Sequence, residues 1–264
     1  MSVCWHPHSY ELSIKKLSGW NKHCKTVDTV ALGGSRCDYG INPDYFDKTT
    51  YNFGLTSLDA FGTYHLLKKI HKSAPNLKNV VFVYSVHLPG YKLWKCSEKF
   101  RCAYYKMAFG IPYPYVGRTR KIKAKIRSHK AVSVPDDFLG YYNPESSIGN
   151  DIVNRTRGHL KHMLRDKSQL KYLRKMARLC RRRGYNLIVI ISPARSDYCN
   201  LIHPYFIELS LQYIQHYMGL AGINMFADSA FTDDDFCDSD HLNAKGAIKL
   251  SKKINNIIKE ISHD

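Results

Sequence analysis

Long hydrophobic runs are absent from this sequence of 264 residues, whose longest apolar stretch is NLIVIIS at 186–192. That length suits one buried strand, whereas a helix that crosses a bilayer needs about 18 consecutive apolar residues. The opening residues, MSVCWHPHSYELSIKK, also lack the apolar core of a secretory signal peptide. From these absences we expect a cytoplasmic protein without a transmembrane helix.

Closely paired cysteines are absent as well. The eight cysteines are scattered and none forms a CxxC pair, which excludes a zinc ribbon and a thioredoxin-like redox motif. Scattered cysteines in a chain of this length indicate reduced thiols rather than a disulfide framework. Metal-ligand residue types gather in CWHPH at 4–8 and HC at 23–24, but their spacing matches no common zinc pattern. We therefore expect neither a metal nor another cofactor.

Acidic residues are scarce, since 22 Asp and Glu stand against 40 Lys and Arg, giving a formal charge of +18. Such a charge favours polyanionic partners, although a basic solvated surface gives the same count. Basic residues are concentrated in RTRKIKAKIRSHK at 118–130 and RKMARLCRRRG at 174–184. Because no nucleic-acid module is recognisable, we expect an anionic glycopolymer as partner, with peripheral contact to an anionic membrane, rather than nucleic acid.

What the chain does contain is an alternation of buried strands and amphipathic helices. Short apolar runs predict strands at 27–34, 49–54, 79–85, 186–192 and 222–228. Helical spacing of apolar residues predicts helices over 58–75, 168–183 with a stop at Gly184, 204–218, and from Ala244 onward. This alternation predicts a three-layer α/β sandwich with a mainly parallel sheet. We expect one domain over residues 1–264, with a basic insertion or cap at about 90–165.

Two distant stretches carry the residue types of nucleophilic catalysis. Ser35 follows the first predicted strand in GGSR, and Asp238 and His241 lie in DSDHLNAKGA, just before the last helix. A serine hydroxyl becomes a good nucleophile when a base takes its proton and an acid orients that base. Taken alone, GGSR is more typical of a turn, and DSDH is more typical of a helix N-cap beside an exposed histidine. Their occurrence together, at both ends of an alternating α/β chain, favours catalysis. Other acids that can replace Asp238 are Asp233, Asp234, Asp235 and Asp240.

These motifs resemble the SGNH/GDSL hydrolase superfamily. The resemblance rests on LGGSR followed by GINP, on YNFG, and on DxxHLNxxGA, and it covers roughly residues 27–258. It is strongest toward the divergent branch that acts on bacterial surface polysaccharides and cell-wall polymers. It implies a flavodoxin-like three-layer fold with Ser35 as nucleophile, His241 as base and Asp238 as acid. It also implies an oxyanion hole made by the backbone N–H of Ser35 with Gly54, or with Asn52 nearby.

The chain departs from the family pattern at the third block. After the strand at 79–85 the family often has G-x-N-D, whereas this chain has YSVHLPGY. Either Ser85 or His87 substitutes for the missing asparagine, or the oxyanion hole has two donors. Loss of one donor lowers the rate about 10²–10³-fold in a serine protease.

Further polar residues follow the predicted strands, where the crevice of a parallel α/β sheet lies. Ser85, Ser192 and Asp228 are therefore expected at the same edge as Ser35. We expect Arg36, Ser85, His87 and Arg195 to bind substrate. Arg195, in ISPARSDY, can clamp an anionic group in a bidentate fashion or remain a surface arginine in a turn.

The sequence thus predicts a serine-dependent esterase that removes O-acyl groups, acetyl first, from a glycan or glycopolymer. Two alternatives remain open. One is an O-acyltransferase of the same fold that modifies a surface polysaccharide, such as a capsule. The other is a non-catalytic binder of acidic glycan or RNA, which the high positive charge and the missing asparagine favour.

Overall fold

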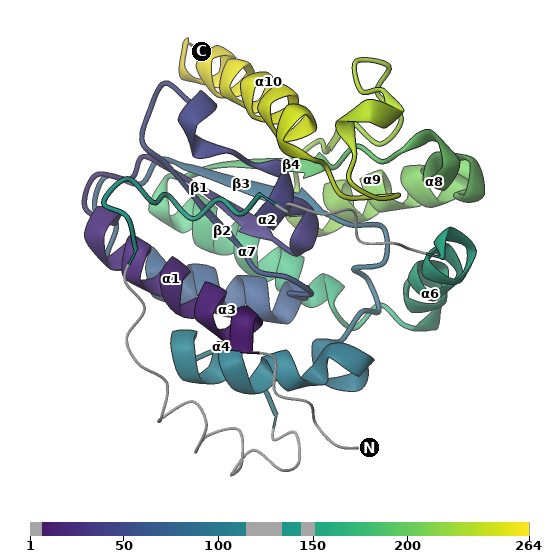
Figure 1. The fold of residues 1–264 in the computed structure, drawn as a ribbon, viewed down its shortest axis with the longest axis horizontal. Coiled ribbons are helices and arrows are strands. Elements are labelled where there is room, and N and C mark those ends of the chain that lie inside the picture. Colours follow the sequence, from purple (N-terminus) through teal and green to yellow (C-terminus); the bar gives the residue numbers. More distant parts are fainter. Residues whose placement is uncertain (1–6, 115–133, 144–150, 264) are drawn as a thin grey trace.

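The centre of the computed structural model, which describes residues 7–114, 134–143 and 151–263, is a sheet of five parallel strands (Figure 1). The strand order is β2-β1-β3-β4-β5. Their bounds are β1 Thr29–Gly33, β2 Thr50–Gly54, β3 Asn79–Tyr84, β4 Asn186–Ile191 and β5 Ile223–Asn224. This is the flavodoxin-like order of a doubly wound sheet, whose crevice lies where the winding reverses between β1 and β3. The predicted fold class is confirmed.

Helices cover both faces of the sheet and give the three layers (Figure 1). Alternate strand residues point to opposite faces, so Leu32 packs with α3 and α7 while Ala31 packs with α2 and α10. The helices are α1 Pro7–His23, α2 Ser35–Gly40, α3 Ala60–Ile70, α4 Arg101–Phe109, α6 Ile152–Arg165, α7 Leu170–Arg183, α8 Ser196–Leu201, α9 Pro204–Met218 and α10 Ala244–His263. Short 3₁₀ turns are η1 Pro43–Tyr45, η2 Leu93–Lys95, η3 Ser97–Phe100 and η4 Asp233–Asp235.

The predicted strands and four helices lie where the apolar patterns put them, with shorter ends. The strands could be predicted as apolar runs because both faces of the sheet are covered. As a result β1, β2 and β3 are buried along their whole length. Gly184 ends α7 in the left-handed conformation, as predicted. The last strand is much shorter than the predicted 222–228, since β5 pairs over two residues only.

Helix α1 was not predicted, and its buried side explains why. Lys16 is fully buried on that side, where it interrupts the apolar pattern. Its ammonium group lies 2.7 Å from Asp38 Oδ1 in α2 and donates to the carbonyl of Gly54 at 2.7 Å. The buried ion pair between Lys16 and Asp38 thus holds α1 against α2, the helix that begins at Ser35.

The region at 90–165 supplies α4, which packs on α1, and α6, which packs on α8. The basic run 118–130 lies outside the described residues. In the second basic run, α7 buries Leu173, Met176 and Cys180 and exposes its arginines at 181–183, as a solvated helix face does. No helix within the described ranges is long and apolar enough to cross a bilayer. The cysteines of those ranges are free thiols.

Candidate active site

Ser35 lies at the carboxyl end of β1, where the strand turns directly into a short helix. Gly33 adopts a φ of 152°, and a Cβ there would come 2.9 Å from the carbonyl oxygen of Val83. Only glycine fits this close approach, which lets the chain turn at Gly34 and start α2 at Ser35. The first side chain of this helix is the serine hydroxyl.

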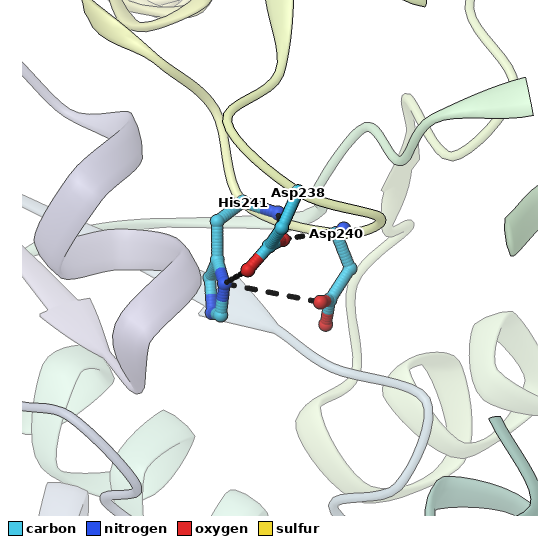
Figure 2. Close-up of side chains that lie close together, drawn as sticks. All are labelled: Asp238, Asp240 and His241. Carbon is cyan, nitrogen blue, oxygen red and sulfur yellow. Dashed lines mark hydrogen bonds and ion pairs between the residues drawn. The ribbon is translucent and has the colours of Figure 1, made fainter. Parts of the chain in front are cut away.

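His241 connects Ser35 to Asp238. Its Nε2 lies 2.7 Å from Ser35 Oγ. Its Nδ1 lies 2.7 Å from Asp238 Oδ2, the contact drawn in Figure 2. Burial opposes ionisation of Asp238, but the hydrogen bond and charge of His241 lower its pKa. Because an ionised carboxylate only accepts hydrogen bonds, Nδ1 of His241 carries the proton, and Nε2 accepts from the Ser35 hydroxyl. The two sequence stretches therefore meet with the spacing of a nucleophile, a base and an orienting acid.

Asp238 is fixed by the loop that carries it. Its Oδ1 accepts the backbone N–H groups of Asp240 at 3.0 Å and His241 at 2.8 Å. The carboxylates of Asp233 and Asp235 face Ser196 and Lys249 instead. Among the acids that the sequence left open, Asp238 is therefore the one bonded to the imidazole.

Asp240 joins two arginines beside this chain of hydrogen bonds. Arg36 donates to its Oδ2 from Nε at 3.1 Å and Nη2 at 2.8 Å, and Arg155 of α6 donates to its Oδ1 at 2.6 Å. Burial opposes ionisation, but the basic groups of His241, Arg36 and Arg155 hold the pKa of Asp240 well below its usual range. Arg155 also brings Nη2 to 3.4 Å from His241 Nε2. A buried ionic cluster thus ties α2, α6 and the Asp238–His241 loop together.

Asp238, Asp240 and His241 offer metal-ligand atoms that lie within 4.8 Å of one another (Figure 2). The chemistry of their surroundings does not suit a cation, because both oxygens of Asp240 already accept from guanidinium groups. A metal ion here would lie beside the fixed positive charges of Arg36 and Arg155. The donor set therefore fits proton transfer better than metal binding.

A pocket of about 280 Å³ opens over Ser35 at the carboxyl ends of β1 and β3. Arg36, Ser85 and His87, which the sequence predicted to bind substrate, all line it. Its other wall comes from α6, which the sequence analysis did not connect with the site. The residues that α6 contributes are Asn154, Arg155, Gly158, His159 and His162. Their pattern held no catalytic motif, so only the packing of α6 against the sheet edge reveals them.

The histidines of the pocket wall are neutral near pH 7. His87 and His159 stack with ring centroids 4.3 Å apart. Burial, and then the neighbouring basic groups His159 and Arg36, lower the pKa of His87 well below its ordinary value. Burial lowers the pKa of His159 to about 3 despite the nearby charge of Asp240. Neutral imidazoles both donate and accept hydrogen bonds, so this wall can bind hydroxyl groups.

The predicted oxyanion donors Gly54 and Asn52 need correction, because neither lines the pocket. The N–H of Gly54 donates to Asn52 Oδ1 at 2.8 Å. Asn52 is fully buried, and its Nδ2 donates to the carbonyls of Cys37, Asp38 and Ile41. These two residues hold α2 and the following turn against β2. They thereby position Ser35 without contacting the pocket.

Ser35 and Ser57 both line the pocket. As the first residue of α2, Ser35 has an N–H without an acceptor inside the helix. Ser57, in the loop after β2, also lines the pocket, and its φ of 61° is unusual for a residue other than glycine. No sequence pattern indicates Ser57, because its backbone conformation alone distinguishes it.

Gly54→Ala tests the positioning role of Gly54. A Cβ there would lie 2.3 Å from the backbone nitrogen of Asp38, so α2 must shift away from β2. We expect a loss of about 1–3 kcal/mol in the free energy of unfolding, measured by denaturant unfolding. Gly158→Ala is the matched control, because its Cβ meets no atom within 4 Å and alanine favours the helix. Unchanged stability of Gly54→Ala would contradict this role.

Other predicted residues lie away from the pocket. The Arg195 guanidinium pairs with Asp197, and Arg195 does not line the pocket, so the predicted substrate clamp is wrong. Asp228 pairs with Lys253 of α10 rather than facing Ser35. Ser192 is buried and also lies outside the pocket lining. Of the strand-end residues, Ser35 and Ser85 reach the same cavity.

Comparisons with known proteins give little beyond this geometry. No protein-family model matches the chain, and no curated protein matches it. One similar solved structure is described as "a putative platelet activating factor from Streptococcus pneumonia". It shares 11% identity over 94% of this chain and 92% of that chain, with a TM-score of 0.48. A likeness of this size assigns neither a family nor an activity.

Proposed function

We propose that this protein is a serine-dependent hydrolase of the SGNH type that removes O-acyl groups, acetyl first, from a glycan or glycopolymer. The observation that carries the proposal is the continuous hydrogen-bonded chain from Ser35 through His241 to Asp238, with 2.7 Å at each contact. This chain opens into a pocket at the crevice of a doubly wound sheet. Nucleophile, base and orienting acid are thereby present in one place.

In the proposed reaction, Ser35 Oγ attacks the ester carbonyl carbon while His241 Nε2 takes its proton. The imidazolium then gives that proton to the leaving alkoxide of the sugar, and an acyl-enzyme forms on Ser35. Water, deprotonated by His241, attacks the acyl-enzyme and releases the carboxylic acid and free Ser35. Asp238 keeps the imidazole in the tautomer that this sequence of steps requires.

Charge on the ester oxygen develops next to groups that can stabilise it. The backbone N–H of Ser35, at the start of α2, is the proposed donor to this oxygen, and Ser57 lines the same pocket. The guanidinium of Arg155, 3.4 Å from His241 Nε2, adds a fixed positive charge beside the reacting hydroxyl. Preorganised donors of this kind supply a large part of catalysis in acyl transfer.

The pocket wall supports a sugar as the group that carries the acyl chain. Its volume of about 280 Å³ leaves room for an acyl group beside Ser35. The neutral rings of His87 and His159 can exchange hydrogen bonds with hydroxyl groups, and Tyr91 packs edge-on against His87. A hydroxyl-rich substrate therefore matches the wall better than a purely apolar one.

Covalent labelling tests the nucleophile directly. A fluorophosphonate probe is expected to phosphonylate Ser35, because this serine donates to an imidazole that can accept its proton. Mass spectrometry of the digested protein identifies the labelled residue. Ser85→Ala is the matched control and is expected to keep the label, since Ser85 lines the same pocket without contacting His241. Labelling of another residue, or loss of the label in Ser85→Ala only, would contradict the assignment.

Product analysis separates hydrolysis from transfer. The protein is given an acetylated donor ester together with a glycan acceptor, and the products are followed by mass spectrometry. Release of free acetate without acetylated acceptor supports the esterase proposed here. Acetylated acceptor, with formation that depends on Ser35, identifies an acyltransferase instead.

A further inference from the structure

Helix α6 carries a row of exposed apolar side chains that the proposed reaction does not use. Val153 and Leu164 are 49% and 69% exposed, and Leu160 lies between them on the same side of the helix. Leu201, at the end of α8, is 42% exposed and extends the row. Helix α8 lies beside α6 (Figure 1). Together they line a shallow surface hollow of about 530 Å³. Clustered apolar side chains on a surface mark an interaction site.

Basic residues border this apolar row. Arg157 and Lys161 line the hollow, and Arg165 is exposed one turn further along α6. The residues that line the hollow include no acid. An exposed apolar stripe flanked by Lys and Arg is the pattern of a helix that lies at a membrane surface.

The charges favour a bilayer over a second copy of the chain. Two copies that met through α6 would place Arg157 and Lys161 of each against the same cations of the other, in a protein of formal charge +18. Anionic lipid instead offers phosphates to the cations and an apolar layer to Leu160 and Leu164. We propose that this face of α6 and α8 docks on the surface of an anionic lipid bilayer.

Docking would bring the active-site pocket close to the membrane, because α6 serves both surfaces. Arg155 and His159 face the pocket, while Arg157, Leu160 and Leu164 lie on the neighbouring stripe of the same helix. A membrane-associated acylated glycan would then approach Ser35 from the lipid side. Binding to lipid does not depend on the proposed ester chemistry, so each can fail without the other.

Co-sedimentation with vesicles tests the proposal. The protein is expected to bind vesicles of phosphatidylcholine with phosphatidylglycerol, and to bind vesicles of phosphatidylcholine alone much more weakly. Lys161→Gln is expected to weaken binding about fivefold and Leu164→Ser about tenfold. Ile261→Ser is the matched control, because Ile261 is a 39% exposed apolar residue on α10 and is expected to leave binding unchanged.

Three results would overturn the proposal. The first is no binding to the anionic vesicles. The second is binding that Leu164→Ser and Lys161→Gln leave unchanged, which would assign the contact to another basic surface. The third is a dimer in sedimentation velocity that Leu164→Ser dissociates, which would make a second copy the occupant. Turnover of a soluble acetyl ester, measured on the same variants, reports separately on the proposed function and is expected to stay unchanged.

Discussion

Replacing Ser35 by alanine is expected to lower kcat for a chromogenic acetyl ester by at least about 10³-fold. The hydroxyl that donates to His241 Nε2 is the only group of this serine side chain that can form the acyl-enzyme. KM is expected to change less than kcat, because the pocket wall and not only the hydroxyl contacts the bound ester. Steady-state kinetics on the purified variant measure both constants, and circular dichroism checks that the fold is retained.

Asp238→Asn gives an independent check on the same chain of hydrogen bonds. Oδ1 of residue 238 must still accept the backbone N–H groups of Asp240 and His241, so the amide nitrogen would face His241 Nδ1. An N–H donor at that position forces the imidazole proton onto Nε2. A protonated Nε2 cannot accept the hydrogen bond from the Ser35 hydroxyl. We expect kcat to fall about 10⁴-fold, as for the corresponding change in a serine protease triad.

Ser97→Ala serves as the control for both variants. Ser97 lines the pocket but is exposed and has no role in the proposed reaction, so its loss is expected to leave most of kcat. Full activity in Ser35→Ala would end the proposal of serine-based ester chemistry. Absence of turnover and of fluorophosphonate labelling in the parent protein would favour the non-catalytic glycan binder.

The sheet and the position of Ser35 at its edge could be predicted because their signals are local. An apolar run that ends in glycines indicates a buried strand with a tight exit, and DxxH before an amphipathic helix places a carboxylate beside an imidazole. Parallel strands end at one edge, so Ser35 and His241 could be expected to meet although 206 positions separate them. The hydrogen bond between Ser35 and His241 was established only by the structure.

The rest of the site could not be predicted because it depends on packing between distant segments. Asp240 looked like one acid among several, and only the fold surrounds it with Arg36 and Arg155. Gly54 follows the family pattern in sequence, yet its N–H is bonded to Asn52, which no spacing rule reveals. Arg195 follows a strand like Ser35 does, but a local ion pair with Asp197 holds it away from the pocket.

Replacing Asp240 by alanine is expected to have the largest effect on stability. The carboxylate is 2% exposed and its partner Arg36 is 4% exposed, so the substitution leaves a buried guanidinium without its counter-charge. Loss of one partner of a buried ion pair costs about 3–5 kcal/mol in the free energy of unfolding. Denaturant unfolding monitored by circular dichroism measures the change. Asp136→Ala is the control, because the exposed pair of Asp136 with Lys22 is expected to contribute little.

The same carboxylate predicts how stability depends on pH. Asp240 has a pKa well below its usual range in the folded protein, so the unfolded chain binds its proton at higher pH than the folded chain does. Its contribution is therefore present above the unfolded pKa of about 3.9 and is lost as pH falls through the lower folded pKa. Asp240→Asn is expected to be less stable than the parent near neutral pH and to lose less stability on acidification. Parallel curves of unfolding free energy against pH for the two proteins would show that Asp240 is not held ionised by Arg36 and Arg155, and that the cluster joining α2 to α6 is not an ion-pair network.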